Sequence, residues 1–166
     1  RLPRRGRVSD ALFVDNFVPF SSAVVRRAVF EKVGPMDTAL SMGIDWDLWL
    51  RASVHFDFEF VDEELLDYRV GHVGQMSHRQ EERYGWAEKI MSAFLTRHPG
   101  VVSPSVVTWA WAHTYNNRGY YYRERDLKRS TAFYVRSIAT QPVQINAYRG
   151  LLGNVWSTLR ASGKKT

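Results

Sequence analysis

The sequence predicts a helix-rich α+β fold, in which a few short strands and helices are followed by a bundle of about four α-helices. Hydrophobic residues make up 45% and aromatic residues 14% of the 166 residues, which is enough to fill a core. Patterns typical of strands occur only before residue 78, and helical spacing continues from there to the end. We therefore expect two domains, at 1–78 and 79–166.

Three segments before residue 78 are predicted to be strands. Residues 12–25 are rich in β-branched and aromatic side chains, and Pro19 within them favours an edge or a bulge. Residues 56–62 alternate apolar and acidic side chains with period two, which is typical of a half-buried strand. A further short strand is expected at 65–70.

Two helices are expected between these strands. The first covers residues 26–33 and ends at Gly34-Pro35, which is a turn signal. The second begins near Asp45 and runs for about ten residues, because the apolar residues that follow recur at helical spacing. An acidic residue in the first turn of this helix suits the helix dipole.

The second domain is predicted to contain four helices, at residues 78–97, 105–122, 125–140 and 143–160. Part of it has spacings that resemble the second half of a tetratricopeptide unit, namely Tyr121-Tyr122, Ser130, Tyr134, Ser137 and Pro142. The first half of that pattern is not matched at Thr114, Asn117 and Arg118. We expect a helical hairpin similar to such repeats.

Positive charge is concentrated in the second domain. Residues 1–117 hold 13 Lys/Arg and 15 Asp/Glu, a balance of −2, whereas residues 118–166 hold 10 and 2, a balance of +8. A basic tail suits anionic lipid headgroups, nucleic acid or an acidic protein, and it is also typical of a solvated helical face. Nucleic acid is the partner we do not expect, since the tyrosines at 120–122 cannot share one helix face.

Several classes of protein are excluded or disfavoured by composition. The chain has no cysteine, which excludes disulfides, zinc-thiolate sites and thiol nucleophiles. No apolar run is long enough to span a bilayer, and the basic start has no apolar segment typical of a secretory signal behind it. Because the chain opens in a basic stretch without a methionine, we expect it to be part of a longer protein.

The residues that suggest chemistry lie around Asp45. This carboxylate is expected at a helix start between Gly43-Ile44 and the large ring of Trp46, and His72 follows the last predicted strand. A carboxylate beside apolar rings, with a histidine nearby, suits the removal of a proton from a hydroxyl group. The pattern therefore favours an enzyme.

Three blocks of sequence resemble a known family. They are FSSAVVRRAVFEKVG at 20–34, DWDLWLR at 45–51 and VDEELLDYRVGH at 61–72. Together they resemble the C-terminal half of a family 2 glycosyltransferase with the GT-A fold, over roughly residues 12–78. The resemblance implies a partial GT-A α/β domain that transfers a sugar, with inversion, from a nucleotide-sugar to an acceptor hydroxyl.

The resemblance also implies roles for individual residues. Asp45 matches the family's general base, while Ile44 stands where the family normally has a second acidic residue. His72 matches a position that completes the coordination of a divalent metal or touches the diphosphate. Mg²⁺ or Mn²⁺ is therefore expected in the full-length enzyme, with a nucleotide-sugar as its substrate.

Other implied contacts have structural alternatives. Trp46 and Trp49 present a flat wall to a sugar ring, or they are core residues. Arg69 neutralises phosphate, or it pairs with a neighbouring carboxylate. Ser21 and Ser22 match the loop that approaches the donor sugar.

Asp45-Trp46-Asp47 also spells the D-x-D pattern of a metal site, and we reject that assignment. Residues two apart on a helix point in directions about 200° apart, so the two carboxylates cannot easily share one ion. We expect Asp47 to pair with Arg51 on the outer face of the helix. Asp45 then remains as the base, or as a helix cap alone.

The function predicted from sequence is thus a glycosyltransferase fragment of cell-surface polysaccharide or glycolipid assembly. Its partners would be a nucleotide-sugar and an acceptor glycan or glycolipid, in the cytoplasm or peripherally at the inner face of the membrane. No nucleotide-binding half is recognised, so we expect the fragment to be inactive alone. The alternative is a non-catalytic helical module that docks a protein or an anionic membrane through its basic tail.

Overall fold

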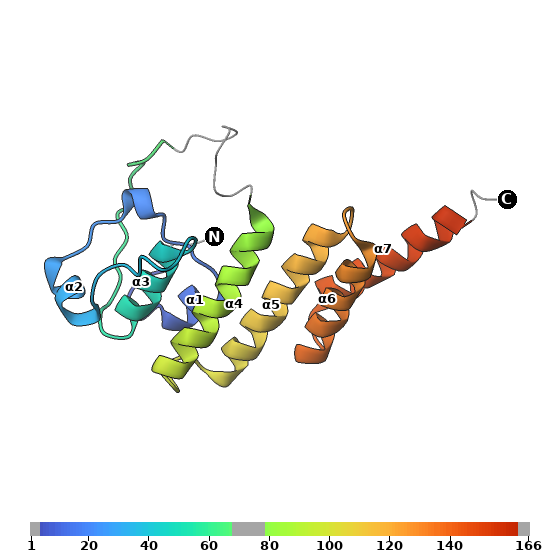
Figure 1. Ribbon diagram of the computed structural model, residues 1–166. Helices are drawn as coiled ribbons and strands as arrows, with labels where there is room; N and C mark the ends of the chain where they lie inside the picture. Colours follow the sequence, from blue (N-terminus) through green and yellow to red (C-terminus); the bar gives the residue numbers. More distant parts are fainter. Residues whose placement is uncertain (1–3, 68–78, 163–166) are drawn as a thin grey trace. The chain divides into compact units, whose positions relative to one another are not determined.

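The computed structural model describes residues 4–67 and 79–162, and its regular elements in these ranges are all helices, joined by irregular segments (Figure 1). The described part contains seven α-helices and one 3-10 helix. Their bounds are α1 Ser9–Val14, η1 Phe20–Ser22, α2 Arg27–Val33, α3 Ile44–Ser53, α4 Gln80–Arg97, α5 Pro104–Tyr122, α6 Leu127–Thr140 and α7 Ile145–Ser162.

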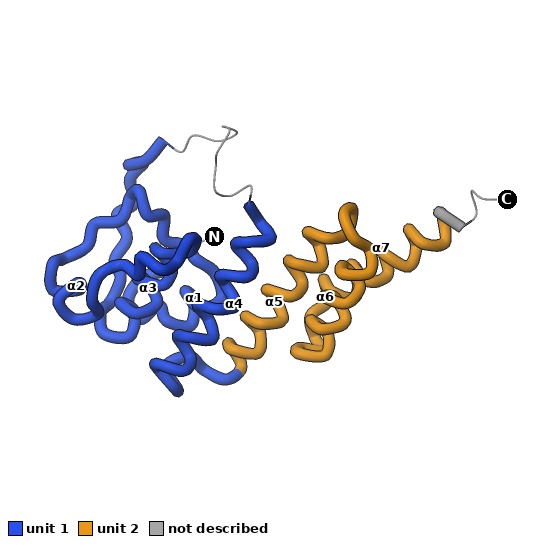
Figure 2. The backbone as a smooth tube through the Cα atoms, viewed as in Figure 1, with its two compact units in different colours: residues 1–104 blue, residues 105–166 orange. Residues whose placement is uncertain are grey.

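The chain divides into two compact units (Figure 2). Unit 1 comprises residues 1–104 and contains helices α1 to α4. Unit 2 comprises residues 105–166 and contains nearly all of α5, with α6 and α7. The domain boundary expected after residue 78 falls at the end of segment 68–78, which lies outside the described residues.

The prediction of an α+β fold with a partial GT-A α/β domain is wrong for this chain. Within the described residues there is no sheet, and the single β-bridge joins Gly6 to Phe58. The segment expected as a strand at 12–25 instead begins inside α1 and contains η1. Segment 56–62 forms only the bridge at Phe58, and 65–67 has no regular structure, while 68–70 lies outside the described residues.

The strand prediction was wrong because alternating apolar and polar side chains form a strand only where a neighbouring strand can pair with it. A strand is stabilised by hydrogen bonds to a neighbouring strand, and the described part of the chain offers only the short pairing with Gly6. Leu12 and Phe13, which suggested a strand, are fully buried on helix α1 instead. Val61 and Leu65 remain 59% and 63% exposed.

The predicted helices are confirmed with small shifts at their ends. The helix expected at 26–33 is α2, and the helix expected to begin near Asp45 is α3. The four helices expected after residue 78 are α4 to α7. Helical periodicity succeeded because these segments have apolar side chains at helical spacing, which α3 and α4 bury in unit 1 and which α7 leaves exposed on one face.

Helix α3 forms the centre of unit 1 and contacts α1, α2 and α4. Its Leu48 and Leu50 are fully buried, as is Leu12 of α1. Phe13 packs against Phe94 of α4 with 6.0 Å between the ring centroids. These contacts fix the direction of α3 and therefore the position of its first turn.

The start of α3 depends on a glycine. Gly43 is the residue before the helix and has a φ of +72°, a conformation that costs other residues energy. A Cβ at this position would lie 2.8 Å from the Cδ1 atom of Ile90 on α4. The backbone angle therefore strongly favours glycine at position 43, two residues before Asp45, and the nearby end of the Ile90 side chain adds to this preference.

Unit 2 is built around one tyrosine. The ring of Tyr134, on α6, is 2% exposed and packs against glycines of the two neighbouring helices. A Cβ added at Gly119 of α5 would lie 2.7 Å from this ring, and one added at Gly150 of α7 would lie 2.2 Å from it. The absence of side chains at these two positions lets three helices meet around a large ring.

Buried hydroxyl groups join α6 to α5. Ser130 donates a 2.7 Å hydrogen bond to the carbonyl of Gly119, and Ser137 donates a 2.7 Å bond to the carbonyl of Ala112. Asn154 of α7 donates to the hydroxyl of Ser130 at 2.8 Å. The spacing at Ser130, Tyr134 and Ser137 thus marks a helical hairpin, as the sequence indicated.

None of the helices in the described segments is both long enough and apolar enough to cross a bilayer.

Candidate functional site

Asp45 lies in the first turn of α3 and is half-buried. Its Oδ1 atom accepts the backbone N–H of Trp46 at 2.8 Å, and its Oδ2 atom accepts the side-chain amide of Asn16 at 3.1 Å. The first turn of a helix favours a negative charge because its backbone N–H groups are free. The carboxylate is therefore held in a fixed orientation while part of it remains accessible to solvent.

Asn16 is a member of the site that the sequence did not reveal. It lies in the irregular segment between α1 and η1, and its Oδ1 atom accepts the backbone N–H of Val18 at 3.4 Å. The oxygen of this amide is thus held by the backbone of Val18, while its nitrogen donates to Asp45. The sequence gave no signal for this contact, because the two residues are 29 positions apart and the segment was expected to be a strand.

Asp47 has a structural role in α3. It forms an ion pair with Arg51 at 2.8 Å, and the side chains are only 10% and 12% exposed. Arg51 also donates to the carbonyls of Val33 and Pro35, at 2.5 and 3.1 Å, and so connects α3 to the end of α2. The predicted pairing is confirmed, but the pair is buried and does not lie on an outer face.

This pairing bears on the D-x-D pattern. The Oδ2 atom of Asp47 is occupied by the guanidinium of Arg51, while Asp45 is bound to Asn16. Two carboxylates with separate partners on different faces do not form a metal site, so the described residues do not fit a metal bound by Asp45 and Asp47 together. No group of three or more His, Asp or Glu side chains suited to a metal occurs in the described ranges.

The two tryptophans near Asp45 are core residues of unit 1. Trp46 is 9% exposed, and its indole N–H donates to the carbonyl of Leu12 at 2.6 Å. Trp49 is 3% exposed and lies between the rings of Phe20 and Phe58, at 6.4 and 6.5 Å. This burial leaves little ring surface for a sugar and favours the packing alternative.

Ser21 and Ser22 are exposed in η1. Ser22 donates a 3.4 Å hydrogen bond to the carbonyl of Pro19, and the neighbouring Phe20 packs against Trp49. Both hydroxyl groups are thus carried on a short turn anchored to α3. Arg69 and His72, the other predicted site residues, lie outside the described residues.

A second surface feature belongs to α7 in unit 2. Six large apolar side chains on one face of this helix are between 42% and 69% exposed, namely Ile145, Tyr148, Leu152, Val155, Trp156 and Leu159. We call them the α7 apolar stripe. The opposite face is buried at Ala147, Gly150 and Asn154. An apolar face of this size on a helix is typical of an interaction surface.

Comparison with known proteins gives no relative for this chain. No protein family, no curated protein and no solved structure matches it. The assignment of function therefore depends on the residues and geometry described above.

Proposed function

We propose that this chain forms the acceptor-side part of an inverting glycosyltransferase, with Asp45 as the general base. The observation that carries the proposal is the Asp45 carboxylate itself. It is partly exposed in the first turn of α3 and oriented by Asn16, within sequence blocks that resemble family 2 glycosyltransferases. The resemblance is one of sequence motifs and does not extend to an α/β fold in the described residues.

The chemistry requires only a weak base in the correct position. As the acceptor oxygen forms its new bond to the sugar, its proton becomes strongly acidic and passes to the Asp45 carboxylate. The bond between the sugar and the nucleoside diphosphate breaks at the same time, and the diphosphate leaves with the electron pair. Asn16 positions the carboxylate by donating to Oδ2, which leaves the remaining lone pairs to meet the acceptor.

Other residues support the site in this proposal without contacting the acceptor. Trp46 and Trp49 fix α3 in the core, and the Asp47–Arg51 pair fixes α3 to α2. The hydroxyls of Ser21 and Ser22 are proposed to meet the donor sugar, on the resemblance alone. Arg69 and His72 are proposed to meet the diphosphate and its metal, on the resemblance alone.

The proposal has two consequences for activity. The 166-residue chain alone should not turn over a nucleotide-sugar, because no phosphate-binding glycine-rich motif is recognised in it. In the full-length protein, Asp45→Asn should lower kcat by about 10²- to 10⁴-fold, which is the usual contribution of general base catalysis. Release of nucleoside diphosphate from a panel of nucleotide-sugars measures both.

The matched control is Asp47→Asn, the same chemical change two residues further along α3. If the two carboxylates shared a metal ion, both substitutions would abolish transfer. The proposal expects Asp47→Asn to lower stability and to leave the kcat of folded molecules within a few-fold of wild type. Turnover by the 166-residue chain alone would contradict the proposal.

A second function is favoured by the α7 apolar stripe, and we propose that it docks on an anionic membrane surface. From residue 127 to the end the sequence contains seven Lys/Arg and no Asp/Glu. Arg149 and Arg160 fall beside the stripe on the helix, and Trp156 lies within it. An apolar face with tryptophan, bordered by basic residues, is the composition of helices that lie in the membrane interface.

Co-sedimentation with vesicles of phosphatidylcholine and phosphatidylserine tests this docking. Leu152→Asp, in the stripe, should reduce the bound fraction by about tenfold, because a charge in the apolar face opposes insertion. Val135→Asp is the matched control, since Val135 is 51% exposed on α6 outside the stripe and gives the same change of charge. Equal loss in both variants, or no dependence on salt, would contradict membrane docking.

A further inference from the structure

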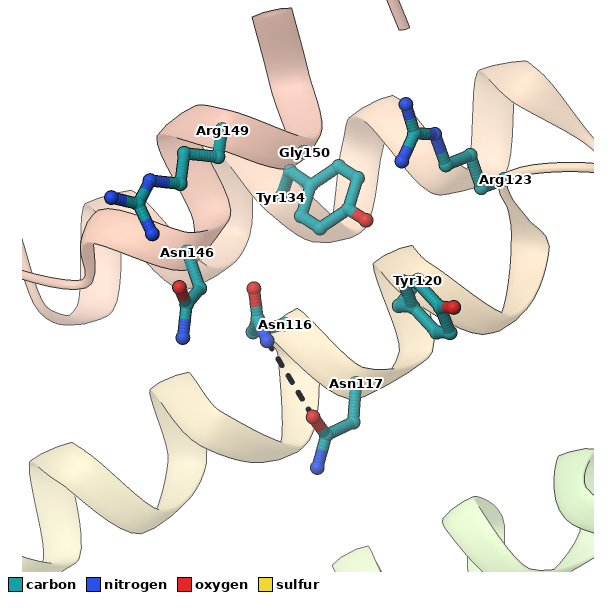
Figure 3. Close-up of a pocket in the computed structure, with 8 residues that line it drawn as sticks. All are labelled: Asn116, Asn117, Tyr120, Arg123, Tyr134, Asn146, Arg149 and Gly150. Atoms are coloured by element: carbon teal, nitrogen blue, oxygen red, sulfur yellow. Dashed lines mark hydrogen bonds between the residues drawn. The ribbon is translucent and has the colours of Figure 1, made fainter. Parts of the chain in front are cut away.

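An open pocket of about 380 Å³ lies on unit 2, lined by α5 and the turn after it, by α6 and by α7 (Figure 3). Its lining residues are Asn116, Asn117, Tyr120, Arg123, Tyr134, Asn146, Arg149 and Gly150. The α5 side, from Asn116 to Arg123, is about 10 Å long at about 1.5 Å per residue. That length matches about three residues of an extended peptide chain, which rises by about 3.3 Å per residue.

The floor of the pocket carries a hydroxyl group without a partner. Tyr134 is 2% exposed, and its hydroxyl makes no hydrogen bond within the described part of the chain. Figure 3 shows this hydroxyl directed towards the side of the pocket that carries Arg123 and Tyr120. Burial raises the pKa of the phenol above the ordinary value of 10.0, although Arg123 opposes the effect, so the group is protonated at neutral pH. An unpaired polar group in a buried residue is costly, and a ligand acceptor would complete it.

Two arginines lie at separate places along the pocket. Arg123 follows the end of α5 and lies against Gly153 of α7, whereas Arg149 lies just after Asn146 near the start of α7. Figure 3 shows the two guanidinium groups on opposite sides of Tyr134 and directed apart. Neither arginine has an ion pair or hydrogen bond in the described ranges, where no acidic residue lines the pocket. Separated positive charges of this kind suit a ligand whose negative charges are also separated.

The α7 side of the pocket presents an accessible amide group. Asn146 is exposed, and its side chain makes no hydrogen bond within the described residues. An amide side chain holds a donor and an acceptor next to each other, as a peptide backbone does, so it can bond to both the N–H and the C=O of an extended chain. On the α5 side, Tyr120 is 71% exposed and adds an apolar ring face. Amide, hydroxyl and ring surfaces between two cations are the groups that an acidic peptide contacts.

We propose that this pocket binds an extended acidic peptide segment of a partner protein. Asn146 and the Tyr134 hydroxyl bond to the peptide backbone. Arg123 and Arg149 each bind a different carboxylate, because acidic side chains two residues apart on an extended chain stand on one face and are about 7 Å apart. The balance of +8 over residues 118–166 favours an acidic partner. The site is independent of the proposed transferase chemistry, since all of its lining residues belong to unit 2.

Fluorescence anisotropy of the labelled peptide fluorescein-Gly-Glu-Ala-Glu-Ala-Glu-Gly-amide, titrated with the 166-residue chain, tests the proposal. Saturable binding at one peptide per chain is expected, and the absence of binding to wild type would overturn the proposal. Arg123→Gln and Arg149→Gln should each weaken binding by about tenfold, the effect of losing one charge-assisted hydrogen bond. Both side chains are exposed, so these variants should fold normally, which circular dichroism checks.

Arg125→Gln is the matched control, because Arg125 stacks on Tyr121 and donates to its carbonyl outside the pocket. An equal loss of binding in this variant would show general charge attraction and overturn the proposal. Tyr134→Phe removes the unpaired hydroxyl and keeps the buried ring. It should therefore leave the thermal unfolding midpoint of unit 2 nearly unchanged and weaken peptide binding by about threefold or more. Unchanged binding to Tyr134→Phe would overturn the contact assigned to the hydroxyl.

Two further probes separate a peptide from other polyanions. The same peptide with methylated backbone nitrogens keeps its carboxylates and loses its backbone donors, so it should bind about tenfold more weakly. Equal binding of the two peptides would overturn recognition of the backbone. Trigalacturonic acid carries its carboxylates on a sugar chain and should bind more weakly than the unmodified peptide. Tighter binding of this glycan, with the same dependence on Arg149, would assign the pocket to an anionic glycan and overturn the proposal.

Discussion

The two units use different means to hold their helices together. In unit 1 the contacts are made by large rings and by one buried ion pair, with Trp46, Trp49 and the Asp47–Arg51 pair around α3. In unit 2 they are made by small residues, since Gly119 and Gly150 admit the ring of Tyr134. Unit 1 is therefore stabilised by large side chains that pack around α3, and unit 2 by glycines whose lack of a side chain makes room for the ring of Tyr134.

The units also differ in what they leave exposed. Unit 1 exposes apolar side chains in irregular segments, such as Val24 at 100% and Leu65 at 63%. Unit 2 exposes them on a regular helix, as the α7 apolar stripe. In both units the spacing of apolar residues in the sequence marks an apolar face. The helices formed as predicted because a helix makes its backbone hydrogen bonds within itself, whereas a strand needs a neighbouring strand.

The largest effect on stability is expected at the buried ion pair of unit 1. Asp47→Asn leaves the guanidinium of Arg51 buried without a full counter-charge, and we expect a loss of about 3 kcal/mol in the free energy of unfolding. Urea unfolding followed by the amide NMR signals of unit 1 measures this. Glu82→Gln, in the exposed pair with Arg79, should change stability by less than about 1 kcal/mol. Equal losses in the free energy of unfolding for the two substitutions would contradict the larger contribution that we assign to the buried pair.

A smaller loss is expected when the space in unit 2 is filled. Gly150→Ala forces a methyl group against Tyr134, which should destabilise unit 2 by about 1–3 kcal/mol. Gly85→Ala, in α4 with open space around it, is the matched control and should stabilise its helix by about 0.5–1 kcal/mol. Thermal unfolding of the two variants compares them, and a stable Gly150→Ala protein would refute the packing described for Tyr134.

The smallest effect concerns His98, at the end of α4 in unit 1. Burial, and then the neighbouring His55, Arg97 and Arg51, lower its pKa below the ordinary 6.5. The unfolded chain therefore takes up this proton first, so the contribution of His98 to stability is complete above pH 6.5 and falls as the pH drops towards its folded pKa. An NMR titration of His98 should give a midpoint below 6.5, and a midpoint at or above that value would contradict the burial of its ring and the close approach of the neighbouring basic residues.

Part of the fold was predictable from sequence because it depends on local pattern. The bounds of α3 and of the four helices from Gln80 onward follow from helical spacing and from turn signals. The segment at 12–25 was not predictable in this way, since β-branched and aromatic residues also fill helix α1 when tertiary packing requires it.

The candidate site was predictable to a similar extent. Asp45 and the Asp47–Arg51 pair were identified from their positions on one helix. The contact from Asn16 was missed because it joins distant segments, and the pocket beside Tyr134 was missed because it needs three helices to form. A sequence pattern predicts which face of one helix or strand is apolar, whereas these contacts join residues from two or three separate elements.

The most direct test of the account is the kcat of Asp45→Asn measured beside that of Asp47→Asn in the full-length protein. We expect Asp45→Asn to lose about 10²-fold or more in transfer, with the free energy of unfolding lowered by no more than about 1 kcal/mol, the usual effect of losing a charge at a helix N-terminus. Asp47→Asn should show the reverse, with lowered stability and nearly normal transfer by folded molecules. Retention of most transfer activity by Asp45→Asn would contradict the proposed role of this carboxylate.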